Sequence, residues 1–232
     1  MKIDPLLPYQ VVNKIYALNF LTYKYIYFLY KNIFERKEIA LINKMVKPGM
    51  TVLDIGANIG FYTLLLSELV GNKGKVYAFE PEKNNFKNLK KLCSKKKNIV
   101  LNNVAVGEIS GDIDLYISEK LNVDHRTYDN YENRKHHKIK CVSIDSYLGK
   151  AKKIDFIKID TQGFEYKILL GMKRLLQSSK QTVLFCEILP TGLKNTGTSV
   201  KQMFDLLKKW NFKITQLKST SESYTNIIAR RT

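Results

Sequence analysis

Cysteine and histidine are scarce in this sequence, and both shortages restrict the chemistry. The three cysteines, Cys93, Cys141 and Cys186, are odd in number and unclustered among 232 residues. They match neither a disulfide framework nor a zinc site, and we interpret them as reduced core residues of an intracellular protein. The three histidines lack cysteine or carboxylate partners at ligand spacing. The sequence therefore predicts no metal site.

Acidic residues are also in short supply. There are 39 lysines and arginines but 21 aspartates and glutamates, which gives a formal charge of +18 and a pI near 9.7. Such an excess favours an anionic partner: nucleic acid, anionic lipid or an acidic glycan. It also fits lysines spread over solvated faces. Both interpretations stay open, and lysine is most concentrated between Lys83 and Lys97.

Long apolar runs are absent as well. Residues 1–8 offer no secretory signal. Residues 11–34 are rich in tyrosine and phenylalanine, but Asn19 and Lys24 interrupt them, and the apolar piece is far shorter than the ~20 residues of a membrane span. We predict a cap helix that packs by its aromatic face. The alternative is an interfacial helix at a membrane surface. The expected location is the cytoplasm, with peripheral membrane contact as the alternative.

Apolar strands alternate with amphipathic helices along the rest of the chain. This order predicts an α/β fold with a doubly wound, mostly parallel, seven-stranded sheet and an antiparallel terminal strand. We expect a helical cap in residues 1–47 and the main domain in residues 48–232. The predicted strands are 51–55, 75–80, 98–106, 111–117, 139–143, 153–160, 181–188, 212–217 and 224–229. The predicted helices are 35–46, 61–70, 83–93, 143–148, 164–176 and 199–210.

The stretch from Thr51 to Gly60 is typical of the first unit of a nucleotide-binding domain. A short buried strand leads through Gly56 and Gly60 into a helix, whose first N–H groups have no partner in the helix. The Gly-x-x-x-Gly spacing is not the six-residue dinucleotide fingerprint. Asp54 precedes the first glycine by two residues; it would repel a pyrophosphate but suits an amine, a sulfonium or hydroxyl groups.

Acids recur at the ends of predicted strands. Glu80 ends the second strand, where such units hold a ribose diol. Asp160 ends the strand that begins at Lys153. Together with Asp54 they predict a crevice for a cationic ligand that carries hydroxyl groups.

Four motifs at successive strand ends give a resemblance to a known family. They are Asp54–Gly60, Phe79–Pro81, Asn103–Gly107 and Lys158–Glu165. Together they resemble S-adenosylmethionine-dependent methyltransferases of the FkbM type, over roughly residues 35–190. The resemblance implies a Rossmann-like class I methyltransferase fold and S-adenosylmethionine as cofactor.

The resemblance also implies roles for single residues. Glu80 would hold the ribose, Asn103 and Val104 would read the adenine, and Asp160 would lie beside the reactive end of the cofactor. The sequence departs from the family at Gln162, where glutamate is more usual. The residues that would face the methionine part are Asp54, Gly56, Ala57, Asn58 and Gly60.

Methyl transfer to a hydroxyl group requires a base. His125 is the first candidate, because an unperturbed imidazole titrates near neutral pH; Asp160 is the second. Arg126 is expected to bind an acidic group of the substrate in bidentate fashion, and Glu165 is also expected at the substrate. The polar loop from Ser118 to Lys138, which carries His125 and Arg126, has a length that is often functional.

The leading hypothesis is O-methylation of a hydroxyl on a glycan, a lipid-linked sugar or a small metabolite. One alternative is an RNA methyltransferase with the same cofactor site, which the positive charge favours. Another is a non-catalytic, membrane-associated binding protein of the same fold, supported by Gln162 and the aromatic segment 11–34. The acceptor and the oligomeric state do not follow from the sequence.

Overall fold

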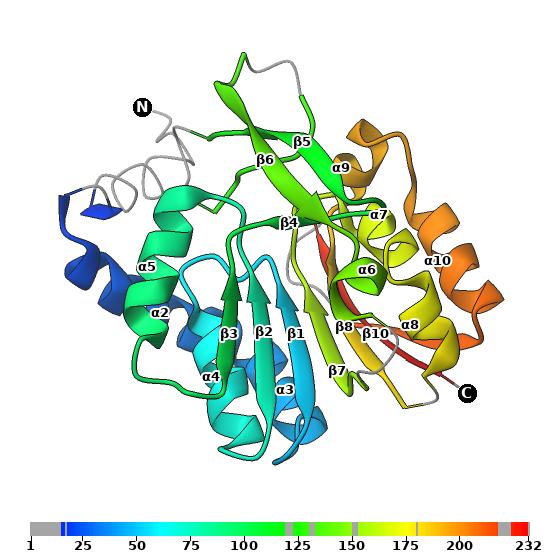
Figure 1. The fold of residues 1–232 in the computed structure, drawn as a ribbon, viewed down its shortest axis with the longest axis horizontal. Helices are drawn as coiled ribbons and strands as arrows, with labels where there is room; N and C mark the ends of the chain where they lie inside the picture. Colours follow the sequence, from blue (N-terminus) through cyan, green and yellow to red (C-terminus); the bar gives the residue numbers. More distant parts are fainter. Residues whose placement is uncertain are drawn as a thin grey trace, which may run out of the picture.

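A central seven-stranded sheet with helices on both faces organises the molecule (Figure 1). This computed structural model describes residues 15–16, 18–118, 123–129, 133–149, 153–179, 181–217 and 224–231. A second, smaller sheet lies beyond the carboxyl ends of the central strands. The second sheet therefore adjoins the main sheet at the carboxyl ends of its strands, whereas the amino ends face away from it.

The strand order of the central sheet is β3-β2-β1-β7-β8-β10-β9. Neighbouring strands from β3 to β8 are parallel, whereas β10 is antiparallel to both β8 and β9. The predicted fold class is confirmed, and the order reverses direction between β1 and β7. The bounds are β1 Thr51–Ile55, β2 Lys75–Phe79, β3 Ile99–Asn102, β7 Phe156–Ile159, β8 Val183–Ile188, β9 Phe212–Gln216 and β10 Thr225–Arg231.

Strand alternation divides the core into two faces. Val52 and Phe156 pack in one cluster, whereas their neighbours Leu53 and Ile157 pack in another. Helices α3 (Arg36–Met45), α4 (Phe61–Val70) and α5 (Lys83–Cys93) cover the first face. Helices α6 (Ile144–Leu148), α7 (Glu165–Leu170), α8 (Lys173–Ser178) and α10 (Val200–Lys209) cover the second. The sheet is doubly wound, as predicted.

Helix α2 (Phe20–Phe34) lies outside this layer and begins at Asn19, whose side chain accepts the N–H groups of Leu21 and Thr22. Its inner face packs by aromatic rings: Phe28 meets Phe61 of α4 edge to face at 5.0 Å. These contacts agree with a cap helix that packs by its aromatic face. The boundary between residues 47 and 48 stays a prediction.

The predicted strand from Asn98 to Val106 is wrong in its second half. The chain leaves the central sheet after Asn102, because the Asn103 side-chain amide donates to the carbonyls of Glu80 (2.8 Å) and Pro81 (3.1 Å) and turns the backbone. The continuation forms an edge of the second sheet. That sheet has the order β4-β6-β5, with β4 Ala105–Val106, β5 Gly111–Tyr116 and β6 His136–Val142.

The single helix predicted from Phe164 to Leu176 is two helices, α7 and α8, which break at Gly171. Gly171 packs directly on the chain at Gly107: a Cβ atom at Gly171 would lie 1.8 Å from the Gly107 carbonyl oxygen. The break therefore comes from a close approach of two backbones. A further helix, α9 (Pro190–Asn195), begins with Pro190 and is not among the predicted helices.

Candidate functional site

The strand order reverses at β1 and β7, and open α/β sheets bind ligands at such a point, beyond the carboxyl ends of the strands. Gly56 follows β1 with a φ of 81°, and a Cβ atom there would lie 1.9 Å from the Asp160 carbonyl oxygen. Gly60 has a φ of 102°, and a Cβ atom there would meet the Leu89 side chain at 2.6 Å. Conformation therefore favours glycine at both positions, and the contact with backbone also requires it at Gly56.

Glu80 ties this turn to the end of β2. Its two carboxylate oxygens accept the backbone N–H groups of Asn58 (2.8 Å) and Glu82 (2.9 Å). Asn58 itself is left-handed, with a φ of 50°, and Ala57 donates its N–H to the Phe79 carbonyl at 3.0 Å. Burial raises the pKa of Glu80 to about 8. The predicted methionine loop and ribose acid therefore form one hydrogen-bonded unit.

Asp54 and Asp160 share a buried cation that we did not predict, Lys158. Lys158 is the partner of Asp54 in the β1–β7 register, and its Nζ lies 3.7 Å from Asp54 Oδ1 and 3.3 Å from Asp160 Oδ2. The other Asp54 oxygen accepts the Thr63 hydroxyl at 2.6 Å. Burial opposes the charge on Lys158, but the Asp160 and Asp54 carboxylates outweigh it and raise the pKa of Lys158. A lysine in an otherwise apolar strand was the signal for this pair.

Gln162 joins Asp160 to an acid that we did not predict for the site, Glu187 at the end of β8. Its side-chain amide donates to Asp160 Oδ1 (3.3 Å) and to Glu187 Oε1 (3.1 Å). Burial and the nearby Asp160 carboxylate raise the pKa of Glu187 to about 8. A glutamate at position 162 would place a third carboxylate between these two, so the departure from the family pattern avoids a repulsion.

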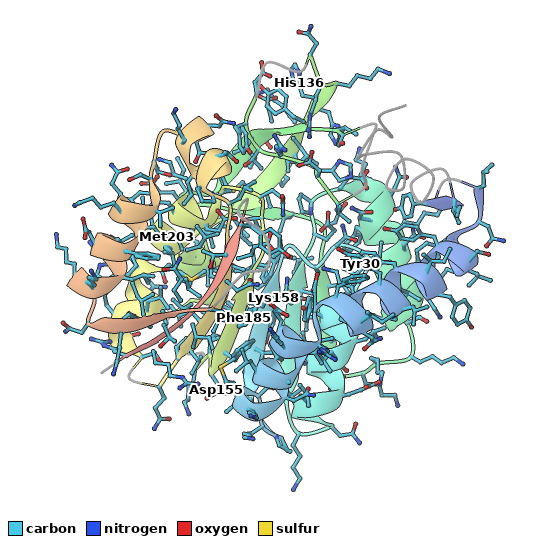
Figure 2. All side chains as sticks on the ribbon, turned by 180° about the vertical axis from the view of Figure 1, so that it is seen from behind. Tyr30, His136, Asp155, Lys158, Phe185 and Met203 are labelled. Carbon is cyan, nitrogen blue, oxygen red and sulfur yellow. The ribbon has the colours of Figure 1, made fainter. Side chains whose placement is uncertain are left out.

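Groups from the cap complete the polar cluster behind these acids. Lys31 of α2 pairs with Glu35 at 2.5 Å, and the Tyr62 hydroxyl donates to Glu35 at 2.6 Å. Lys158 Nζ lies 4.8 Å from the centre of the Tyr62 ring. Figure 2, seen from behind, shows Lys158 at the centre of this face, with α2 and α3 crossing it. A cavity of about 20 Å³ remains here, and Asp160, Lys158 and Glu187 are among the residues that line it.

His125 lies in different surroundings from Asp160. The Ser118 N–H donates to His125 Nδ1 at 3.2 Å, so the neutral ring carries its proton on Nε2. Burial lowers the pKa of His125, although Glu82 and Asp124 act in the opposite direction. The charges that act on Asp160 are instead those of Lys158 and Lys31.

Arg126 and Glu165 are each engaged within the protein. Arg126 Nε pairs with Asp124 at 2.7 Å, and Arg134 pairs with the other oxygen of Asp124 at 2.6 Å. Glu165 is 1% exposed; its Oε1 accepts the N–H of Gly163 and both the N–H and the hydroxyl of Thr161. Burial raises the pKa of Glu165 to about 7. Both residues hold loops beside the site, and their contact with substrate stays a prediction.

The family follows from comparison with known sequences. The model of the methyltransferase FkbM domain matches residues 54–214, well over half of the chain. The chain belongs to the FkbM methyltransferase family. The matched region begins at Asp54 and includes all four strand-end motifs. The cofactor of these methyltransferases is S-adenosylmethionine.

Two relatives differ in their acceptors. Hexuronic acid methyltransferase AglP of Haloferax volcanii is 28% identical over 148 residues, which is 62% of this chain and 59% of AglP. Ribosomal RNA large subunit methyltransferase E of Alkalilimnicola ehrlichii is 40% identical over 47 residues, 20% of this chain and 22% of that protein. The chain thus spans less than two thirds of the length of these curated relatives.

Solved structures agree on the fold. A methyltransferase FkbM from Methylobacillus flagellatus matches 95% of this chain and 57% of its own, with a TM-score of 0.53 and 15% identity. SMU.1697c, a putative methyltransferase from Streptococcus mutans in complex with SAH, matches 86% of this chain and 98% of its own, with a TM-score of 0.55 and 12% identity. At such identities the likeness shows a Rossmann-like fold.

The residues at the strand ends fit the family's cofactor. S-adenosylmethionine carries a sulfonium, an amino group and a ribose diol, which suit carboxylate acceptors. Among the described contacts, Asp54 Oδ1 is buried without a hydrogen-bond partner. Lys158 Nζ lies 3.7 Å from this oxygen, beyond hydrogen-bond distance, so the oxygen can still accept a donor. Asp54 and Glu80 therefore have the chemistry to accept donors of the cofactor.

The described residues offer neither a metal centre nor a membrane-spanning helix. No cluster of three or more histidine, cysteine or acidic side chains there has the arrangement of a metal site. No helix in the described ranges has both the length and the apolar character needed to cross a membrane. The three cysteines are free and buried, as predicted.

Proposed function

We propose that this chain is an S-adenosylmethionine-dependent methyltransferase that methylates a hydroxyl oxygen of a sugar-containing acceptor. The observation that carries the proposal is the direct contact between the cofactor turn and Asp160. Gly56 packs on the Asp160 backbone, so a carboxylate lies where the donor loop meets β7. Family membership supports methyl transfer, and the hexuronic acid named in the AglP relative supports a sugar.

The cofactor residues keep the roles that the resemblance implies. The bound cofactor supplies a methyl group that the sulfonium activates. Glu80 would hold the ribose hydroxyls, and Asn103 and Val104 would border the adenine; Val104 packs partly buried on the core. The turn residues that would hold the methionine part are Asp54, Gly56, Ala57, Asn58 and Gly60.

Asp160 is the better candidate for the base. The basic lone pair of the neutral His125 ring is on Nδ1, where it already accepts the Ser118 N–H, so it is not free to take a proton from the acceptor. Lys158 and Lys31 overcome the effect of burial and lower the pKa of Asp160, so it is ionised at neutral pH. We therefore assign proton removal to Asp160, and to His125 the donation of a hydrogen bond from Nε2.

Arg126 and Glu165 complete the proposal in two different ways. Arg126 lies on the loop beside His125, and we assign it to an acidic group of the acceptor, such as a uronic carboxylate. Glu165 acts as a positioning residue, because its carboxylate holds the Thr161–Gly163 loop that carries Gln162. Neither role requires a metal ion.

Labelled methyl transfer into a cell extract tests the function. The extract is incubated with the purified chain and cofactor and is then separated into RNA, lipid-glycan and small-molecule fractions. We expect label in a glycan-containing fraction, as a methyl ether that survives mild alkali. Alkali-labile label would instead indicate a carboxylate oxygen, and label in RNA would contradict the proposal.

The assignment of the base has its own test. Asp160→Asn should lower kcat by roughly 10²–10⁴-fold, the usual contribution of a general base, while cofactor affinity changes little. His125→Ala should act mainly on KM for the acceptor. Asp205→Asn, the same change on the exposed side of α10, is the matched control. A larger loss of kcat in His125→Ala than in Asp160→Asn would reverse the two roles.

One observation supports the RNA alternative, a groove that six lysines line. It measures about 1130 Å³ and is lined by Lys73, Lys75, Lys95, Lys96, Lys97 and Lys153. It also includes Thr51, the first residue of β1, and so lies at the amino ends of the strands. A five-residue strand spans roughly 16 Å, which separates the groove from Asp160. RNA held there would not by itself bring a nucleotide to the site, and binding with a steep salt dependence tests this alternative.

A further inference from the structure

The outer face of α2 exposes large apolar side chains to an unusual degree. Of the ten large hydrophobic residues that are most exposed in the described chain, eight lie between Leu18 and Phe34. They are Leu18, Leu21, Tyr25, Ile26, Leu29, Tyr30, Ile33 and Phe34. Contiguous apolar surface of this kind marks an interaction site.

The exposure follows from a helix that carries apolar side chains on both its inner and its outer side but is covered on one. Tyr23, Tyr27 and Phe28 recur at helical spacing and turn toward the protein. The residues between them turn outward, and they too are mostly apolar. A helix that is apolar all round is normally buried. The outer face of α2 therefore requires a partner that the inner face does not supply.

The charges around this face identify the partner. Lys24, Arg36 and Lys37 flank it, and the acid between Leu18 and Lys37, Glu35, is engaged with Lys31 and Tyr62 on the inner side. Apolar and tyrosine side chains with flanking cations are the composition of a helix that lies in a membrane interface. A formal charge of +18 opposes face-to-face pairing of two copies of this chain and favours an anionic surface.

We propose that the outer face of α2 docks this protein on an anionic lipid bilayer, with the helix axis along the membrane surface. Leu21, Tyr25, Leu29 and Ile33 enter the boundary between head groups and acyl chains. Lys24, Arg36 and Lys37 contact the acidic head groups. The inference concerns location and stands apart from the methyl-transfer proposal.

Sedimentation with vesicles tests the docking of the full chain. The probes are vesicles of phosphatidylcholine alone and vesicles that also contain about one third phosphatidylglycerol. We expect binding to the mixed vesicles to be at least roughly tenfold tighter, since each cation near an anionic surface adds to the affinity. Wild-type protein that does not sediment with the mixed vesicles overturns the proposal, as does equal binding to both kinds.

Paired variants locate the docking face. Tyr25 and Leu29 are 69% and 61% exposed, so Y25E/L29E leaves the core intact and should weaken binding by at least roughly tenfold per substitution. The matched control is Ile109→Glu, 76% exposed in the turn before β5, which should bind as the wild type does. The neutral pair L21Q/I33Q gives a second measurement if the first pair folds poorly.

Two results of these measurements overturn the proposal. One is vesicle binding by Y25E/L29E that equals that of the wild type. The other combines three results: light scattering shows a wild-type dimer, Y25E/L29E is a monomer, and neither protein binds vesicles. A second copy of the chain would then cover the outer face of α2. Loss of docking should leave the thermal stabilisation by S-adenosylmethionine unchanged. Failure of the docking proposal is therefore distinct from failure of the methyl-transfer proposal.

Discussion

Lys158 lies between the carboxylates of Asp54 and Asp160, and its side chain is 4% exposed. A buried carboxylate that loses its partner carries the full cost of desolvation. The charge balance of the crevice therefore depends on one side chain in β7. The same position makes Lys158 the clearest test of the electrostatics at the scale of single residues.

Lys158→Met should lower the free energy of unfolding by about 3–5 kcal/mol at neutral pH, because the buried Asp54 and the partly exposed Asp160 lose their counterion. Urea unfolding at neutral pH measures the loss, and it should shrink at lower pH as these acids protonate. The control is Lys138→Met, which breaks a pair with Asp114 on the surface and should cost about 0–1 kcal/mol. Equal losses in the two variants would contradict the role of Lys158.

Stability should fall as the pH rises from about 5 to 8. The pKa values of Glu80, Glu165 and Glu187 are all raised in the folded protein, to about 8, 7 and 8. In this window the folded state keeps protons that the unfolded state has released, so each of these groups loses its stabilising contribution as the pH rises.

Glu165→Gln tests this dependence at one residue, because glutamine keeps an oxygen that accepts the loop N–H groups but does not titrate. We expect its slope of unfolding free energy against pH to be smaller by up to about 1.4 kcal/mol per pH unit below pH 7. Urea unfolding from pH 5 to pH 8 measures both slopes. Parallel curves for wild type and variant would show that Glu165 does not titrate with a raised pKa.

At the scale of elements, the boundary between α7 and α8 depends on the backbone contact of Gly171. Gly171→Ala should destabilise the fold by about 1–3 kcal/mol or more, since the added Cβ atom would overlap the Gly107 carbonyl. Gly111→Ala is the control, because a Cβ atom there meets nothing within 4 Å. Chemical unfolding of both variants measures the two losses of stability. An alanine at position 171 that costs no more than the one at position 111 would show that the backbone contact does not cause the break.

The sequence predicted the bounds of a helix well where glycine or proline lies next to its ends. Helix α4 was predicted at its observed bounds between Gly60 and Gly71, and α5 follows Pro81 and the capping side chain of Glu82. The bend after Asn102 escaped prediction because its cause is a hydrogen bond from Asn103 to the end of a different strand. The break at Gly171 has the same kind of distant cause.

The same distinction holds within the candidate site. Acids at strand ends are visible in a sequence, and Asp54, Glu80 and Asp160 do gather at one edge of the sheet. Lys158 and Glu187 were missed because alternation marks a polar residue in a buried strand without showing its partner. The tautomer of His125 depends on the N–H of Ser118, seven residues earlier, and no pattern in the sequence indicates this contact.

At the scale of the whole molecule, the excess of cations should make stability depend on salt. With a formal charge of +18, the folded chain repels itself, and added salt screens that repulsion. We expect the midpoint of thermal unfolding to rise with sodium chloride concentration. A decrease, or no change, would contradict net repulsion.

The lysine groove offers a variant for this measurement. K95Q/K97Q removes two of its charges, so its midpoint at low salt should exceed that of the wild type and its salt dependence should be weaker. The control K208Q/K209Q removes two exposed charges from α10 instead. An equal rise of the thermal midpoint in the two variants would show that charge repulsion in the groove is no stronger than on the remaining surface.

Helix α2 connects the outside of the molecule with its chemistry. Tyr25 and Leu29 point outward, whereas Lys31 points inward to Glu35 and contributes to the charge that acts on Asp160. A tilt of this helix would change both faces together. For an acceptor held at the membrane, the rate of turnover would follow the area of lipid surface rather than the concentration of the protein in bulk solution. Helix α2 would then control both where the protein lies and how fast it turns over.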